Sequence, residues 1–180
     1  MSSIKITEED NLIIQPFMIG NLLLELKSKN FLNSKYFTEN FNSSLYEILK
    51  SMTLDSQGLV IMLFYAFLVV PYEKLKTKAK LEYDYINKKI DDAVKNRVFI
   101  LNSNYPDNNY LLHMRNSVAH VRFKFISGTS LTFIDKKEKN KRKYSFELTV
   151  PLFKLHLILI DLQNLIINYF NNNRESVKGD

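Results

Sequence analysis

Apolar residues recur every three or four positions along most of this chain, which is the spacing of one face of an α-helix. The repeat predicts a helix over about 16–28, with Pro16 in its first turn, and a second helix over about 44–53. A third helix is expected to begin near Asp55 and to reach Val70. Because this third segment is apolar nearly all round, it is predicted to lie at the centre of a bundle.

The helical spacing continues beyond the third segment. Pro71 is expected to end or kink that helix, since proline lacks the N–H that a helix interior needs. Helix is predicted to resume in the basic stretch that begins at Lys74 and to continue to about residue 96. A short helix then starts at Pro106 and Asp107, which suit a first helical turn.

After residue 120 the apolar positions alternate, which is the spacing of a β-strand. The predicted strands cover 121–125, 131–134 and 144–148, with a turn at 127–129. The expected fold class is therefore mainly α, a helical bundle with a small antiparallel β-meander at about 121–149, inserted before a C-terminal helix over 151–170. Residues 1–170 are expected to form one domain, and 171–180 a polar, flexible tail.

Composition narrows the possible functions. The formal charge of +6 and the pI of about 9.3 favour anionic partners such as RNA. The absence of cysteine excludes disulfides, thiolate zinc sites and cysteine nucleophiles, and the four glycines form no phosphate-binding loop. The apolar run Leu59–Val70 is shorter than the ~20 residues that cross a bilayer. With no signal-peptide pattern at the N-terminus, a cytoplasmic protein without membrane contact is predicted.

The segment from Arg115 to His120 carries the candidate chemistry. RNA supplies its own nucleophile, the 2′-hydroxyl, so an enzyme needs only to move protons and stabilise phosphate charge. His120 could be the general acid or base, and Arg115 could bind the phosphate through parallel N–H bonds. Asn116 could orient either group. This scheme needs neither metal nor cofactor, and the three residues are the predicted catalytic set.

The spacing also constrains the local structure. On a continuous helix, Arg115 and His120 would be separated by about 140° of rotation. Either Arg115 curls round the helix, or the helix ends near Ala119 and His120 lies at its C-terminus. The strand pattern that opens at Val121 favours the second arrangement. The plain alternative is that Arg115 pairs with a surface acid and His120 is a partly buried cap.

Other polar residues have two readings each. His113 is either an auxiliary phosphate ligand or, more simply, a surface residue, and His156 is predicted to be a core or interface histidine. Asp135 and Glu73 either position the catalytic groups or lie at a hairpin end and on a helix surface.

A basic loop is predicted after the second strand, interrupted by Glu138 and Asn140. It either grips an RNA backbone or is a solvated hairpin loop. Tyr110 is a candidate for stacking on a base. The predicted RNA-binding residues are Arg122, Lys124, Lys139, Lys141, Arg142, Lys143 and Tyr110.

Arg115, Asn116 and His120 together resemble the signature of the HEPN superfamily, an arginine, a polar residue directly after it, and a histidine four to six positions on. Their surroundings resemble one bacterial and plasmid-borne branch of HEPN nucleases. The similar parts are the apolar run that ends at Val70, the hairpin with the step Phe133–Asp135, and the last helix, so the resemblance spans about residues 55–170.

The resemblance implies a HEPN-like α-helical core that forms a homodimer and joins two motifs in one composite cleft. Active members are metal-independent endoribonucleases that leave 2′,3′-cyclic phosphate ends and commonly act as toxins, with an antitoxin partner, or in phage defence. Other members are inactive modules that bind RNA, a nucleotide or a partner protein. A third reading is a helical interaction domain in which the motif is accidental.

Overall fold

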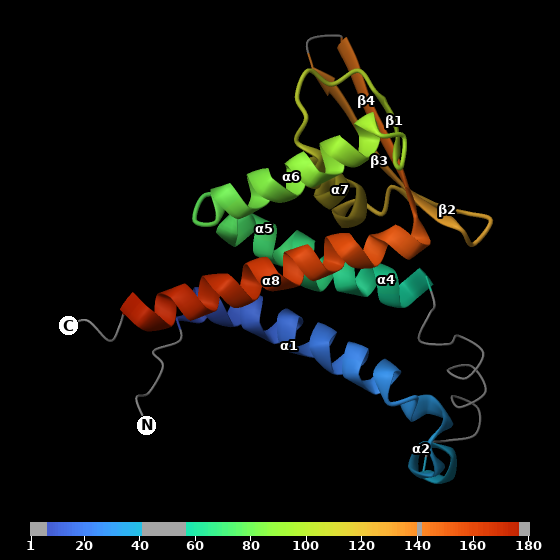
Figure 1. Cartoon of the computed structure of the whole chain (residues 1–180), viewed down its shortest axis with the longest axis vertical. Coiled ribbons are helices and arrows are strands. Elements are labelled where there is room, and N and C mark those ends of the chain that lie inside the picture. The colour runs from blue at the N-terminus through green and yellow to red at the C-terminus, as the bar shows by residue number, and fades with distance from the viewer. Residues whose placement is uncertain (1–6, 41–56, 140–141, 177–180) are drawn as a thin grey trace.

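The computed structural model describes residues 7–40, 57–139 and 142–176 (Figure 1). Helices cover most of this part of the chain, and one antiparallel sheet lies at one end of them. The mainly α prediction is therefore confirmed, although the sheet is larger than a simple hairpin. The predicted helix over 44–53 and the start near Asp55 lie outside the described residues.

The first helix is longer than predicted. Helix α1 spans Glu8–Ser28 and begins at a capping box in which the Thr7 side chain accepts from the Asp10 N–H and Asp10 accepts from the Thr7 N–H. Pro16 lies inside α1 rather than in its first turn. A 3₁₀ turn, η1 (Phe31–Asn33), and the short helix α2 (Lys35–Asn40) follow.

The central helix does not end at Pro71. Helix α4 (Gln57–Phe64) passes into a π-helical turn, η2 (Tyr65–Val69), and then into α5 (Val70–Leu75). The Val70 N–H donates to the Tyr65 carbonyl, five residues back. This wider turn lies where the proline ring would otherwise meet the carbonyl four residues before it, so the helix continues through Pro71.

Over Gln57–Leu75 the central helix is long and apolar enough to cross a membrane, but 56% of its most apolar stretch is buried inside the fold. Phe64, Phe67 and Leu68 are almost fully buried, which confirms the prediction that this segment lies in the core. Gly20 of α1 packs so closely on η2 that an added Cβ would lie 2.7 Å from the Phe67 ring.

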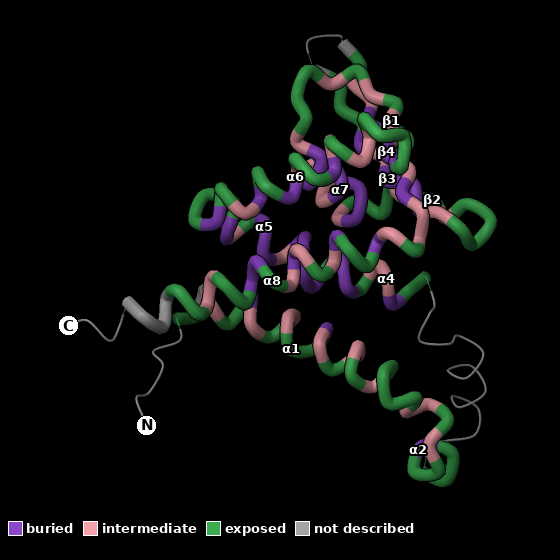
Figure 2. The backbone as a smooth tube through the Cα atoms, viewed as in Figure 1, coloured by how far each residue is buried: buried purple, intermediate pink, exposed green. Residues whose placement is uncertain are grey.

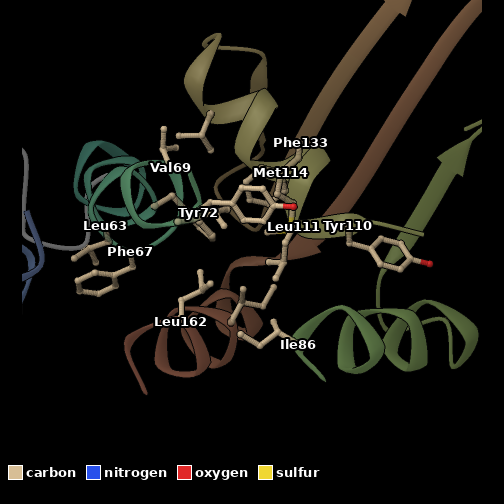
Figure 3. Packing of buried hydrophobic residues seen from close by; sticks show 14 of the residues in the cluster. Leu63, Phe67, Val69, Tyr72, Ile86, Tyr110, Leu111, Met114, Phe133 and Leu162 are labelled. Carbon is tan, nitrogen blue, oxygen red and sulfur yellow. The ribbon is translucent and has the colours of Figure 1, made fainter. Parts of the chain in front are cut away.

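The remaining helices enclose this centre. Helix α6 (Lys80–Lys95) begins six residues later than the basic stretch suggested, and α7 (Tyr110–Ala119) begins after Pro106–Asp107 rather than at them. Helix α8 (Leu152–Ser176) extends six residues beyond the predicted end at residue 170, into the segment predicted to be a polar tail. The buried residues concentrate where these helices meet the sheet (Figure 2). Side chains of α7, β3, α6 and α8 meet there around the central helix (Figure 3).

The sheet has the order β1-β4-β3-β2, with all neighbours antiparallel. Its strands are β1 (Ile100–Ser103), β2 (Phe123–Ile126), β3 (Ser130–Lys139) and β4 (Arg142–Pro151). The edge strand β1 was not predicted. The turn at 127–129 is confirmed, with positive φ at Ser127 and Gly128 and a bond from the Thr129 N–H to the Ile126 carbonyl. One face of β3 carries Leu131, Phe133 and Asp135, the first two of them fully buried.

Candidate functional site

Helix α7 carries the motif and ends where the sequence suggested. The side chain of Asn109 accepts from the Leu112 N–H and caps its start, and His120 is the C-cap residue. Beyond it, the N–H groups of Val121 and Arg122 donate to the carbonyls of Val118 and Ser117, which is the Schellman pattern of helix termination. His120 is exposed, in contrast to the predicted alternative of a partly buried cap.

Val121 does not open a strand as predicted. Its φ of 54° is left-handed, and strand β2 begins two residues later, at Phe123. Glycine usually occupies this position of a Schellman motif, because a left-handed backbone strains a β-branched residue. The Val121 side chain is 72% exposed. The chain therefore turns sharply, with local strain, directly after the candidate catalytic histidine.

Arg115 is held from two sides. Its Nη2 lies 2.7 Å from Oε1 of Glu73 on α5, and its Nη1 donates to Oδ1 of Asn116 at 3.1 Å. Its Nε is buried and has no hydrogen-bond partner among the described residues. The side chain is 22% exposed, so the guanidinium is held from two sides and the side chain remains partly accessible to solvent. The partner acid predicted for Arg115 is thus Glu73, and Glu73 contacts a candidate catalytic group.

Asn116 joins the motif to the sheet. Its Nδ2 donates to Oδ2 of Asp135 at 3.0 Å, and the same carboxylate oxygen lies 2.9 Å from Nδ1 of His113. Nε2 of His113 faces Oδ1 of Asp107 at 3.1 Å. The prediction that His113 is a surface residue is wrong, since it is 2% exposed.

Aromatic rings enclose His113. Its ring centroid lies 4.6 Å from that of Phe146, nearly parallel to it, and 4.2 Å from that of Tyr105. Burial raises the pKa of Tyr105, and the charges of Asp135 and Asp107 raise it further. Around His113, the structure therefore combines a buried histidine, the buried carboxylate of Asp135, the exposed carboxylate of Asp107 and a neutral phenol in an aromatic setting.

Ser117, which the sequence reading did not single out, locks the end of α7 onto β3. It is fully buried; its hydroxyl donates to the Arg122 carbonyl at 2.6 Å and accepts from the Ile134 N–H at 3.0 Å. Tyr65 lies at the same end and donates from its hydroxyl to the Ala119 carbonyl at 3.4 Å. A small polar residue among apolar helix positions was the only sequence signal for Ser117.

The other residues singled out in the sequence lie in different surroundings. Tyr110 is 2% exposed and its hydroxyl donates to Asp91, so the prediction that it stacks on a base is wrong. Lys124 pairs with Thr132, and alternation along β3 puts these residues on the face opposite Asp135. Arg122 is exposed and donates to the Lys136 carbonyl at 3.2 Å. His156 is exposed on α8, so it is not a core histidine.

The predicted basic loop is instead the end of a two-stranded ribbon. Lys136 and Lys137 belong to β3, and Lys143 is an exposed residue of β4. Lys139 and Arg142 pair along the backbone, but their side chains, like all of Lys141, lie outside the described part. Among the described residues, no group of three or more histidines and carboxylates is arranged to hold a metal ion.

A mainly helical fold with an ordered Arg–Asn pair and an exposed histidine at the end of one helix fits the HEPN class. The chain matches the family model described as HEPN pEK499 p136 over residues 1–173, and it belongs to this HEPN family. The match includes the first 50 residues, which had contributed nothing to the resemblance. Membership suggests a nuclease-like or nucleotide-binding module. No curated protein and no solved structure matches the chain.

Proposed function

We propose that this protein is a metal-independent endoribonuclease in which Arg115, Asn116 and His120 form the active site. The observation that carries the proposal is the end of α7, where a guanidinium fixed by Glu73 and Asn116 lies five residues before an exposed histidine. Membership of the HEPN family and the positive charge of the chain support it. Arg122 at the same end of α7 would add a phosphate contact.

In this mechanism His120 accepts the proton of the RNA 2′-hydroxyl. The 2′-oxygen forms a bond to phosphorus, the bond from phosphorus to the 5′-oxygen breaks, and the departing oxygen takes up a proton. The products are a 2′,3′-cyclic phosphate and a 5′-hydroxyl. Arg115 stabilises the added phosphate charge through its fixed N–H groups. The imidazole has room to exchange protons because it is exposed.

We further propose that two copies join their motifs in one cleft, and that the enzyme acts in the cytoplasm as a toxin or in phage defence, with an antitoxin or other protein partner. These statements rest on the family resemblance alone. A second function is favoured by one observation, the Glu73 ion pair, which occupies the charge of Arg115. It is a HEPN module that binds RNA, a nucleotide or a protein without cleaving RNA.

The test is a cleavage assay on end-labelled tRNA and mRNA in the presence of EDTA, with protein made by cell-free synthesis to avoid toxicity. Wild type, His120→Ala and His156→Ala are compared, because His156 is an exposed histidine outside the motif. We expect cleavage with cyclic phosphate ends in wild type and His156→Ala, and a loss of about 10²–10⁴-fold in His120→Ala. Binding without cleavage by a folded wild type would instead identify the binding module.

A further inference from the structure

A chain of side-chain hydrogen bonds, called the relay below, lies behind the candidate active site. It runs from Arg115 to Asn116, then to Asp135 on β3, and then to His113. Asp107 closes it on the far side of the His113 ring. Asp135 is 6% exposed and His113 is 2% exposed, so water cannot substitute easily for either partner.

The relay sets the orientation of the Asn116 amide. An amide presents a donor at one end and an acceptor at the other, and the two ends here meet groups of opposite kind. Arg115 can only donate, so it requires the Asn116 oxygen, while the ionised carboxylate of Asp135 can only accept, so it requires the NH₂ group. A flipped amide would lose both bonds. Asp135 therefore determines which atom of Asn116 faces the guanidinium.

His113 in turn fixes Asp135. Each ring nitrogen faces a carboxylate oxygen, at 2.9 Å and 3.1 Å, and the doubly protonated ring is the form that donates to both. Without His113, the buried carboxylate of Asp135 would lose one of the hydrogen bonds that offset its burial. The stacked ring of Phe146 and the tilted ring of Tyr105 hold the imidazole in this orientation.

We propose that Asp135 and His113 are positioning residues for the phosphate site. Neither touches RNA. Asp135 holds Asn116, Asn116 fixes Nη1 of Arg115, and His113 orients Asp135. The proposal rests on the endoribonuclease function proposed above, and it extends that site to two buried residues on α7 and β3. Because Glu73 still bonds to Nη2 of Arg115, loss of the relay would change the orientation of the guanidinium but would not free it.

The test compares Asp135→Ala, Asp135→Asn and Thr132→Ala in the full-length protein. Thr132 is a matched control, since it lies on the same strand, is 7% exposed, and bonds to Thr149 on the other face. We expect Asp135→Ala to lower kcat about 10²-fold with little change in KM, because a small misplacement of a catalytic group costs about that much. Asp135→Asn keeps an acceptor for Asn116, and its kcat should be at least tenfold higher than that of Asp135→Ala.

The proposal is overturned if Asp135→Ala keeps the wild-type kcat, or if Thr132→Ala loses as much activity at an equal loss of Tm. A second readout separates it from the proposed function. In ¹⁵N NMR spectra, the side-chain NH₂ signals of Asn116 should shift in Asp135→Asn and in His113→Phe but not in Thr132→Ala. If wild type cleaves no RNA, the endoribonuclease proposal fails. The Asn116 signals still test the relay in that case. Shifted signals would support it, and unshifted signals would overturn it.

Discussion

The two ends of helix α7 are built in opposite ways. At its start, the Asn109 cap, the bond from the Tyr110 hydroxyl to Asp91 at 2.8 Å, and the bond from the Leu111 N–H to the Asn87 side chain at 2.9 Å tie the helix to α6 and to itself. At its end, Ser117 and Ala119 are still bonded, but His120 beyond them is exposed and Val121 is both exposed and left-handed, so these two residues form an open end.

The difference fits the two tasks of the proposed site. A group that stabilises a phosphate gains most when it is fixed before the substrate arrives, so Arg115 belongs to the bonded part of the helix. A group that takes and returns a proton needs access to the substrate, so His120 belongs to the open end. Changes to the buried contacts that hold the bonded part are therefore expected to alter stability, and changes to Arg115 or His120 to alter activity.

The largest expected effect is on RNA cleavage, and it tests whether Arg115 acts through its charge or through its geometry. Arg115→Lys keeps a cation beside Glu73 but loses the planar fork that reaches Asn116. We expect kcat for RNA cleavage to fall about 10²-fold, with a change in Tm that is small beside this loss. Arg97→Lys, at an exposed arginine after α6, is the control and should keep full activity. Equal activity of both variants would contradict the assigned role of Arg115.

The next effect is on stability. His113→Phe keeps an aromatic ring between Tyr105 and Phe146 but leaves Asp135 buried without its partner. We expect the free energy of unfolding to fall by about 3 kcal/mol, measured by urea denaturation. Adding Asp135→Asn should restore part of the loss, because the buried charge is removed. His156→Phe, at an exposed histidine, should change stability little, and a similar loss there would argue against the buried pair.

A smaller effect tests the start of α7 and its dependence on pH. The pKa of Asp91 lies below its ordinary value of 3.8, first because Lys95 bonds to it and next because Tyr110 does. Tyr110→Phe removes the hydrogen bond from the buried Tyr110 hydroxyl to Asp91. We expect the free energy of unfolding to fall by about 1 kcal/mol.

The direction of this pH dependence follows from the lowered pKa. The stabilisation by ionised Asp91 is complete above 3.8 and is lost as the pH falls through the lower pKa of the folded state. The gap in unfolding free energy between wild type and Tyr110→Phe should therefore narrow on acidification below that value. A gap that stays constant from about pH 6 to about pH 2.5 would show that ionised Asp91 does not cause the loss of stability in Tyr110→Phe.

The smallest effect is a gain. Val121→Gly removes the cost of a left-handed β-branched residue and should stabilise the protein by about 0.5–1 kcal/mol, seen as a Tm increase of about 2–4 °C. Val98→Gly is the control, because Val98 is also exposed but has no positive φ, and it should not stabilise. If Val121→Gly lowers Tm, the open end of α7 is not strained in the way described.

The sequence predicted the open end of α7 better than its bonded part. The alternation after residue 120 located the end of the helix, because a change from a period of 3.6 to one of 2 is visible without knowing the fold. The role of His113 was missed because its partners, Asp107 and Asp135, are six and 22 positions away, and only the packing of α7 on β3 brings them together. Asp135 and Glu73 were candidates for positioning roles, but nothing in their spacing could select that reading.

Two differences between the predicted and observed elements also have local causes. The start of α1 was placed at Pro16, although Thr7 and Asp10 have the spacing of a capping box nine residues earlier. Strand β1 was missed because it is a four-residue edge strand whose outward side includes Ile100, 68% exposed, so its alternation is not one of apolar and polar residues. Its position depends on pairing with β4, which lies some 45 residues away.

The π-helical turn η2 makes the site depend on the length of the central helix as well as on its residues. A π-helical turn holds one residue more than an α-helical turn, so deleting one residue within Tyr65–Val69 would leave a regular α-helical turn there. The Pro71 ring would then meet the carbonyl four residues before it, and the resulting kink would move Glu73 relative to Arg115, although both residues would still be present. A gene that had lost this single codon would encode every residue named in the motif and still lack the anchor of its arginine.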